Sequence, residues 1–334
     1  MADEAGSALA ISLGDPAGIG PEIVAKAWVA RDTQRLPHFF AVGDARSIET
    51  VWRGPISRIT DPSHAIHVFP TALPVIEVED AGPITPGDPN PEGARCALAS
   101  LEIAVGLARS GAAAGVVTGP VSKAQLYEAG FTHPGQTEFI AERCGIAKEN
   151  AVMLLAGPTL KVVPITTHIA LNKVIDSLCI EMITAKTRAT ARGLTRNFGI
   201  ENPRIAFAGF NPHAGEQGAI GREEIDLIEP AIAILRDEGF DITGPFAADS
   251  MFHKRARGRY DVAMCLYHDQ ALIPLKTLHF EDGVNMTMGL PIVRTSPDHG
   301  TAFNIAGTGQ ADPSAMIAAI RMAASAAHYR AQYP

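Results

Sequence analysis

Short apolar runs alternate with helix-like segments along most of this chain of 334 residues. Apolar runs of about four to eight residues bounded by Gly, Pro or charged residues are typical of buried strands, and longer segments with apolar residues every three or four positions are typical of helices. The alternation predicts an α/β protein with largely parallel sheets. We expect strands at 8–13, 39–42, 75–78, 115–118, 152–155, 161–165, 205–207 and 262–266, and helices from about 21 and at 92–109, 136–143, 171–196, 222–237 and 313–329.

Two segments rich in Gly and Pro interrupt this pattern. Gly157-Pro158 separates two apolar runs, which predicts a hairpin. The segment AGPITPGDPNPEG at 81–93 predicts a surface loop that connects elements without separating independent domains. The length of the chain fits two lobes or one large α/β domain, at ~100–200 residues per domain.

Composition argues against several classes of protein. No apolar stretch approaches the ~20 residues of a membrane helix, so we expect no membrane partner. The first residues are acidic and lack the basic start of a signal peptide, and the four cysteines contain no CxxC pair. We therefore expect a cytoplasmic protein with reduced thiols. The net charge of −8 argues against nucleic acid as a partner. The basic run at 253–259 is interpreted as a solvated helix end, with a phosphate-facing or subunit-facing role as the alternative.

Three histidines each follow an apolar run. His168, His213 and His268 come after the expected strands at 161–165, 205–207 and 262–266. Ligands of open α/β sheets bind outside the carboxyl ends of the strands, and three imidazoles delivered there are a plausible ligand set for one divalent metal. The wide intervals between them exclude a compact zinc clip. Any one of these residues alone is a common polar group at a strand end.

Three segments with glycine lie between strands and helices or near the C-terminus. GDPAGIGPE at 14–22 matches neither common nucleotide-binding fingerprint, and a plain tight turn explains it equally well. TGPVSK at 118–123 offers Thr, Ser and Lys to an anion, or caps a helix. GTGQAD at 307–312 resembles half of a dinucleotide fingerprint without the surrounding βαβ unit.

A polar segment near the C-terminus supplies possible anion contacts. Lys276, Asn285, Arg294 and Asp298 are interleaved with glycines and apolar residues. Arg offers a planar fork for carboxylate or phosphate, and Lys offers a mobile point charge. Beside a metal held by three histidines, such groups suit a small acidic substrate, although each alone is more typical of a surface ion pair than of a ligand contact.

Together these motifs resemble the 4-hydroxythreonine-4-phosphate dehydrogenase family of pyridoxal phosphate biosynthesis. The resemblance covers residues from about 9 to 330 and is most specific at its last three motifs. The motifs are GDPAGIGPE at 14–22, TGPVSK at 118–123, NPHAGE at 211–216, YHDQ at 267–270 and GVNMTMGLPIVRTSPDHGTA at 283–302.

The resemblance implies a fold like that of isocitrate and isopropylmalate dehydrogenases, in which two α/β/α lobes flank a cleft. We expect one lobe, on the cofactor side, at about 1–125 plus 280–334, and a second, with the metal histidines and the dimer contacts, at about 126–279. The resemblance also implies NAD or NADP as oxidant, a divalent metal (zinc, magnesium or cobalt), and a homodimer whose active site uses both subunits.

The resemblance assigns roles to residues by motif position. His168, His213 and His268 match the metal ligands of the family, and its substrate contacts match Gln136, Thr137, Lys276, Asn285 and Arg294. Many members carry His where this chain has Gln136, and because an amide cannot carry a proton at neutral pH, Gln136 fits a binding role and not acid–base catalysis. The cofactor-binding residues are not identified beyond candidate loops around Gly119, Gly289 and Asp298.

The expected reaction is oxidation of 4-phosphooxy-L-threonine, a small phosphorylated hydroxy-amino acid, by hydride transfer to nicotinamide. The β-keto acid product, 2-amino-3-oxo-4-phosphooxybutanoate, then loses CO₂ to give 3-amino-2-oxopropyl phosphate. Asp249 and Asp269 are candidates for the general base, although capping or pairing is the commoner role of such residues.

Several alternative functions remain open. Close relatives oxidise the 4-phosphates of threonate or erythronate, and more distant ones oxidise aromatic dihydrodiols. A metal-dependent hydrolase or aldolase would use the same histidines without nicotinamide. A phosphate acyltransferase would use coenzyme A and no such metal, and a non-catalytic binding module would leave the convergent ligands without a purpose.

Overall fold

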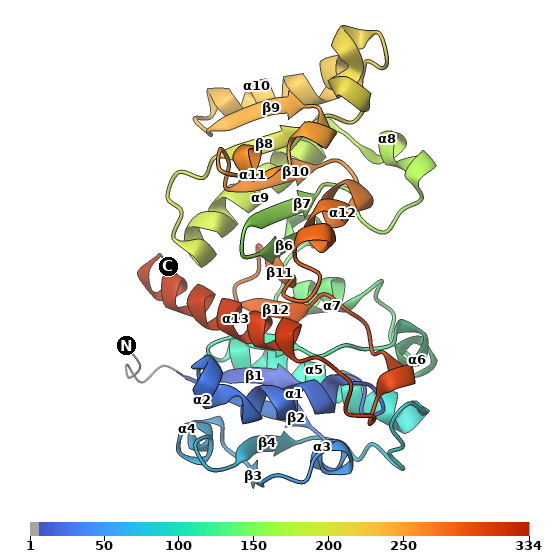
Figure 1. Cartoon of the computed structure of the whole chain (residues 1–334), viewed down its shortest axis with the longest axis vertical. Helices are drawn as coiled ribbons and strands as arrows, with labels where there is room; N and C mark the ends of the chain where they lie inside the picture. Colours follow the sequence, from blue (N-terminus) through green and yellow to red (C-terminus); the bar gives the residue numbers. More distant parts are fainter. Residues whose placement is uncertain (1–6, 334) are drawn as a thin grey trace. The chain divides into compact units, whose positions relative to one another are not determined.

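The chain folds around two sets of strands. In the computed structural model, which describes residues 7–333, the contacts divide the chain into unit 1, residues 7–145 and 290–328, and unit 2, residues 146–289 and 329–333. Each is an α/β unit (Figure 1), as the alternation of the sequence predicted. The boundaries between the two lobes were expected near 125 and 280, and in the structure the chain passes from one unit to the other at 145/146 and 289/290.

Unit 1 contains six parallel strands in the order β3-β4-β2-β1-β5-β12. The strands are short, and all but β3 and β12 are mostly apolar, because a parallel sheet covered by helices is buried on both faces. Phe39, Phe40 and Ile11 are fully buried in its core. The strands are β1 (Leu9–Ser12), β2 (Phe39–Gly43), β3 (Ile56–Ile59), β4 (Leu73–Glu77), β5 (Val116–Thr118) and β12 (Arg294–Pro297).

The helices of unit 1 cover this sheet. One of the two longest, α5 (Pro91–Arg109), begins at Pro91 because the Asn90 side chain caps its first turn, accepting from Gly93 N at 2.6 Å. The buried side of α5, whose residues are mostly small and recur every three or four positions, packs against β1 and β2. The others are α1 (Gly20–Val29), α2 (Arg31–Gln34), α3 (Ala45–Val51), α4 (Ala65–Val68), α6 (Lys123–Glu128), α7 (Gln136–Arg143) and α13 (Ser314–Gln332).

Unit 2 mixes strand directions. Its strands follow the order β11-β6-β7-β10-β8-β9, with antiparallel pairs at β11/β6 and β6/β7 and parallel pairs from β7 onward. The β6/β7 pair confirms the hairpin predicted at Gly157-Pro158. The strands are β6 (Val152–Gly157), β7 (Leu160–Pro164), β8 (Ile205–Ala208), β9 (Ile242–Phe246), β10 (Val262–Cys265) and β11 (Val284–Met288).

Two helices expected in unit 2 are interrupted. The segment expected as one helix at 171–196 is a short turn and α8 (Val174–Ser177), followed by α9 (Ile180–Phe198). The break falls at Cys179, whose backbone is extended and whose sulfur accepts from Met182 N at 3.4 Å. The helix expected at 222–237 starts as a π-helical turn, Glu224–Ile228, before α10 (Glu229–Asp237), because Pro230 has no N–H for an α-helical bond.

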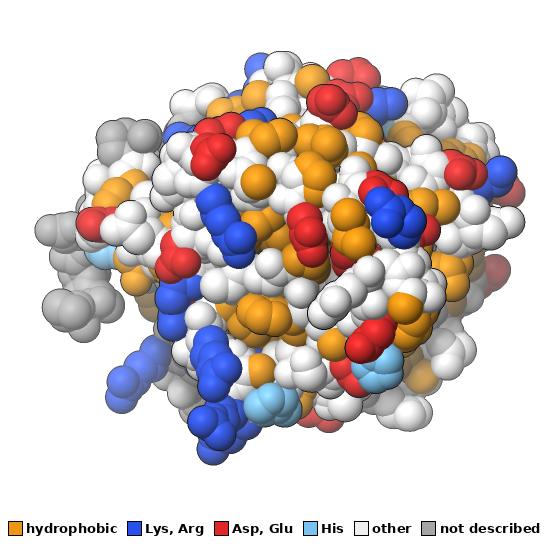
Figure 2. Space-filling view, turned by 90° about the horizontal axis from the view of Figure 1, so that it is seen from above, with side chains coloured by type: hydrophobic (Ala, Val, Ile, Leu, Met, Phe, Trp, Pro, Cys, Tyr) orange, Lys and Arg blue, Asp and Glu red, His pale blue; other side chains and the backbone are white. Residues whose placement is uncertain are grey.

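The remaining helices of unit 2 are α11 (Lys254–Arg257) and α12 (His268–Leu278), which packs on β7, β10 and β6. Among the described residues, none of the helices combines the length and the apolar character that a membrane span requires. The face shown in Figure 2 carries acidic, basic and apolar side chains together, with basic ones gathered at one margin.

Candidate active site

The three predicted metal histidines follow the carboxyl ends of three adjacent parallel strands of unit 2. His168 comes after β7, His268 is the first residue of α12 after β10, and His213 comes after β8. Because β10 pairs in parallel with both β7 and β8, these three ends meet at one edge of the sheet. The structure therefore places the histidines at the edge where α/β sheets bind ligands.

Two of the three imidazoles lie together in one chain. The ring centroids of His168 and His268 are 5.7 Å apart, and His268 Nδ1 lies 2.7 Å from Asp269 Oδ1. A carboxylate at Nδ1 fixes the orientation of an imidazole and leaves Nε2 for a ligand. Within residues 7–333, no group of three or more His, Cys, Asp or Glu side chains is arranged to hold a metal ion. One chain thus brings His168 and His268 together, and His213 follows the neighbouring strand β8.

His213 lies in a strained turn. Its φ is 52°, and Ala214, Glu216 and Gln217 also have positive φ. In this run of left-handed residues only Gly215 is a glycine, so the turn costs energy and persists only where the surroundings hold it. Glu224, which is buried, anchors the turn by accepting from Asn211 N at 2.7 Å. The sequence analysis missed Glu224, and the only signal for it was a carboxylate inside an otherwise ordinary helical segment.

The other candidates in unit 2 lie on α12, on β11 and in a turn. Lys276 on α12 is half-buried, and its Nζ lies 5.8 Å from the Phe280 ring centroid. The Asn285 Oδ1 atom on β11 is buried and accepts no hydrogen bond from the described residues, so it is able to accept one from a bound molecule. The two candidate bases differ, since Asp269 pairs with His268 while Asp249 is exposed in a short turn.

In unit 1, Arg294 forms the centre of a buried polar cluster. Its side chain is 4% exposed, and Nη2 donates to Thr118 Oγ1 at 2.8 Å and to Gln136 Oε1 at 3.4 Å. Burial lowers the pKa of Arg294 to about 10, against the opposing charge of Glu138, so it stays cationic at neutral pH. Gln136 also donates to Gly119 O at 3.3 Å. Thr137, the next residue on α7, is half-buried.

The three glycine segments meet at one edge of the unit 1 sheet. The first follows β1, the second follows β5, and the third lies in the chain after β12, and these strands are neighbours. Asp15 N donates to Pro120 O and Ile19 N donates to Thr301 O, each at 3.0 Å. A side chain at Gly14 would collide with Pro120 O. Segments that are uninformative one by one in the sequence therefore form one surface of closely packed backbone.

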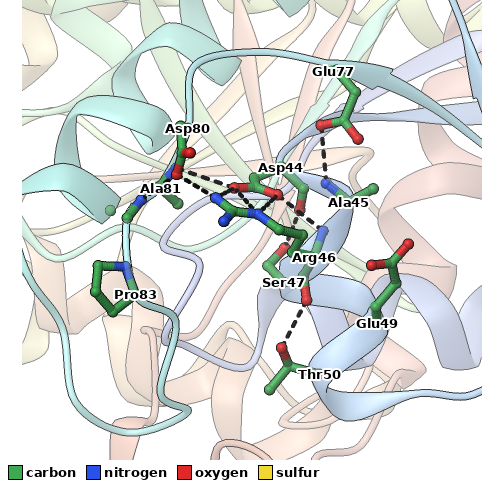
Figure 3. Close-up of polar contacts among 12 residues, drawn as sticks. Asp44, Ala45, Arg46, Ser47, Glu49, Thr50, Glu77, Asp80, Ala81 and Pro83 are labelled. Atoms are coloured by element: carbon green, nitrogen blue, oxygen red, sulfur yellow. Dashed lines mark hydrogen bonds and ion pairs between the residues drawn. The ribbon is translucent and has the colours of Figure 1, made fainter.

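The Pro- and Gly-rich segment 81–93 borders the same surface. Gly87 N donates to Ala17 O at 2.7 Å. The start of the segment is held by Asp44 at the end of β2, whose carboxylate accepts from Ala81 N at 3.1 Å and pairs with Arg46 (Figure 3). Burial alone would raise the pKa of Asp44, but the hydrogen bonds from Arg46 and Ala81 lower it. Arg46 also binds Asp80, so one network ties β2 to the segment after β4.

Comparison with known proteins places the chain among dehydrogenases. A relative from Zymomonas mobilis, 57% identical over 97% of each chain, is named 4-hydroxythreonine-4-phosphate dehydrogenase. A solved structure of an enzyme with that name from Klebsiella pneumoniae superposes with a TM-score of 0.87, at 38% identity over 98% of this chain and 99% of the other. A terephthalate 1,2-cis-dihydrodiol dehydrogenase from Burkholderia xenovorans gives a TM-score of 0.65, at 30% identity over 96% and 98%.

The family model described as pyridoxal phosphate biosynthetic protein PdxA matches residues 35–323. The chain belongs to this family, as its motifs predicted. All the predicted metal and substrate residues, from Gln136 to Arg294, lie inside the matched range.

Proposed function

We propose that this protein is the dehydrogenase that oxidises 4-phosphooxy-L-threonine in pyridoxal phosphate biosynthesis. The secondary alcohol is oxidised to a ketone, its carbon-bound hydrogen passes as hydride to NAD or NADP, and its hydroxyl proton goes to a base. The resulting β-keto acid loses its carboxyl group as CO₂ and gives 3-amino-2-oxopropyl phosphate. The observation that carries this proposal is full-length similarity, at 57% identity, to a relative named for the same reaction.

The metal proposed for this reaction would be held by His168, His213 and His268. The fit rests on the donors present: His168 and His268 are close, partly exposed imidazoles, and Asp269 orients one of them. Imidazole nitrogens suit zinc or cobalt better than magnesium, which prefers oxygen ligands. When bound, such a metal acts as a Lewis acid that lowers the pKa of a substrate hydroxyl.

A second copy of the chain would complete this site. Large apolar side chains are exposed on the segments that carry the two paired histidines: Ile169 and Leu171 follow His168, and Ile273 and Phe280 lie on and after the helix that His268 begins. Phe280 is 78% exposed, which is costly unless another surface covers it. We infer a homodimer in which these residues are buried and an imidazole of the partner completes the ligand set.

In unit 1, the anionic substrate would be bound by Arg294 with Gln136 and Thr137 near it in the same unit. By motif position, Lys276 and Asn285 of unit 2 match the other substrate contacts of the family. A buried guanidinium hydrogen-bonded to a hydroxyl and an amide is suited to one end of a phosphorylated amino acid. The dinucleotide would lie at the carboxyl edge of the unit 1 strands, over the loops that begin at Gly119 and Asp298. The base remains assigned to the pair of candidates Asp249 and Asp269.

We propose that the enzyme is located in the cytoplasm. Cys96, Cys179 and Cys265 are free thiols, which supports a reducing compartment.

Comparison with two other kinds of substrate tests whether 4-phosphooxy-L-threonine is the preferred substrate. Oxidation of threonate or erythronate 4-phosphate is the main alternative, because Gln136 stands where many relatives have His. The similarity to a dihydrodiol dehydrogenase at 30% identity makes an aromatic diol the second. We expect NADH or NADPH to form from 4-phosphooxy-L-threonine at the highest kcat/KM. A higher value for either alternative would overturn the substrate assignment, and turnover without dinucleotide reduction would indicate a hydrolase or aldolase.

A further inference from the structure

A buried carboxylate outside the predicted site holds one of the glycine segments. Glu22, in the first turn of α1, is 3% exposed. Its Oε2 accepts from Gly307 N at 3.2 Å, and its Oε1 accepts from Ala311 N at 3.3 Å. A carboxylate in a first helical turn commonly accepts from the amides of its own helix, yet α1 has no side-chain cap. The two oxygens of Glu22 serve a segment 285 residues away.

Lys26, one turn further along α1, binds the backbone carbonyl groups of the same segment. Its Nζ donates to Gly309 O at 2.8 Å and to Ala311 O at 2.6 Å, and it lies 2.7 Å from Glu22 Oε1. The ion pair therefore makes four hydrogen bonds to the backbone of residues 307–311. Because all four bonds go to backbone atoms, the ion pair fixes the path of the backbone and does not depend on the side chains of this segment.

The segment 307–311 needs such an anchor because its glycines leave the backbone with much conformational freedom. Gly307 and Gly309 have φ of +72° and +78°, and glycine loses more conformational freedom on ordering than any other residue. Residues 307–310 are exposed, whereas Ala311 is buried. The anchor thus holds the inner side of the segment and leaves its outer side open at the edge where the three glycine segments meet.

We propose that Glu22 and Lys26 are positioning residues that set the affinity of the enzyme for its nicotinamide dinucleotide. This inference rests on the proposed function, which places the dinucleotide over the chain that follows β12. A segment ordered in advance loses little entropy when the dinucleotide binds, and a loosened segment must be ordered at the expense of affinity. Neither residue touches the metal histidines or the Arg294 cluster, so substrate affinity and the chemical step are independent of the pair.

The test compares Glu22→Gln and Lys26→Met with the wild type in the metal-loaded enzyme. Lys26→Arg tests rescue, because it keeps the charge and the donors. Glu49→Gln is the control, because it removes a carboxylate from an exposed ion pair with Arg58 in the same unit. Lys26 is one-third exposed, so Lys26→Met keeps the test valid even where Glu22→Gln folds poorly. The measurements are calorimetric Kd for NAD and NADP, steady-state constants, and hydrogen exchange of the backbone amides of 299–312.

We expect Kd and KM for the dinucleotide to rise about tenfold in both variants, since the loss of one or two charge-assisted bonds corresponds to at least a factor of ten. KM for the substrate and kcat at saturating dinucleotide should stay within about twofold of the wild type, and Lys26→Arg should recover most of the affinity. Amides of 307–311 should exchange faster in both variants without dinucleotide.

Three results overturn the proposal in distinguishable ways. If the dinucleotide protects residues 299–312 of the wild type but both variants keep the wild-type Kd, the pair has no positioning role and the proposed function stands. If the dinucleotide protects only residues elsewhere, the placement of the cofactor itself is wrong. A loss of thermal stability alone, with all kinetic constants unchanged, indicates a structural pair and also overturns the proposal.

Discussion

Replacing Gln136 by Glu tests whether the Arg294 cluster binds the anionic substrate. The Gln136 amide oxygen lies 3.4 Å from Arg294 Nη2, so the substitution puts a carboxylate against a buried guanidinium with little change in shape. Coulomb's law at 3.4 Å with an effective dielectric of about 20 gives about 5 kcal/mol. Gln136 is half-buried, and we expect solvent to screen roughly half of this, leaving about 2–3 kcal/mol.

The new carboxylate pairs with the Arg294 guanidinium and so competes with the anionic group of the substrate for it. We therefore expect Gln136→Glu to raise KM for 4-phosphooxy-L-threonine roughly 30- to 150-fold, at about 1.4 kcal/mol for each factor of ten. The melting temperature should be unchanged or higher, because the introduced ion pair offsets the lost hydrogen bond to Gly119 O. A raised KM together with an unchanged or higher melting temperature distinguishes competition for Arg294 from damage to the fold.

The assay is dinucleotide reduction at saturating NAD with varied substrate, together with a thermal melt. Gln34→Glu is the matched control, because Gln34 Oε1 also accepts from an arginine, Arg321, at 2.8 Å, but on the surface of the same unit. The control should leave KM within about twofold of the wild type. If Gln136→Glu also leaves KM unchanged, Arg294 does not bind the substrate and the reasoning fails.

Three further predictions concern the metal, the dimer and stability. His213→Ala should lose dehydrogenase activity and most bound metal by elemental analysis, with a normal circular dichroism spectrum because His213 is exposed; retention of stoichiometric metal would contradict this. Phe280→Glu should give a monomer by light scattering with reduced metal content, whereas an intact dimer would place the interface elsewhere. Asp44→Asn should lower the free energy of unfolding by about 1–2 kcal/mol at pH 7. Because the pKa of Asp44 is lowered in the fold, its contribution is present above the pKa of the unfolded carboxyl and disappears as the pH falls through the folded one. Urea titrations should show this deficit shrinking between pH 5 and the acid limit of the fold, and a constant deficit would refute it.

The sequence predicted those parts of the fold that depend on local apolar pattern. The strands before His168, His213 and His268 are apolar apart from Lys161, so their ends, and the edge that they share, followed from the pattern. β12 was missed because its residues, Arg294–Pro297, are mostly polar even though all four are buried. A strand whose polar side chains are satisfied by distant partners has no local signature.

Contacts between distant residues could not be predicted from the sequence alone. Gln136 and Arg294 are 158 positions apart, and the resemblance to a family identified both without showing that they touch. The anchor at Glu22 was invisible for the same reason, since its partners follow only from the packing of α1 against the chain after β12. Periodicity also concealed the break at Cys179, because apolar spacing continues across it.

The most direct test of metal-assisted, dinucleotide-dependent oxidation is NADH formation from 4-phosphooxy-L-threonine by protein whose metal content is known. The enzyme stripped of metal by a chelator should show no absorbance change with NAD or NADP, and stoichiometric zinc or cobalt should restore it, with CO₂ released in equal amount to NADH. Undiminished turnover by protein shown by elemental analysis to contain no metal would contradict the role proposed for His168, His213 and His268.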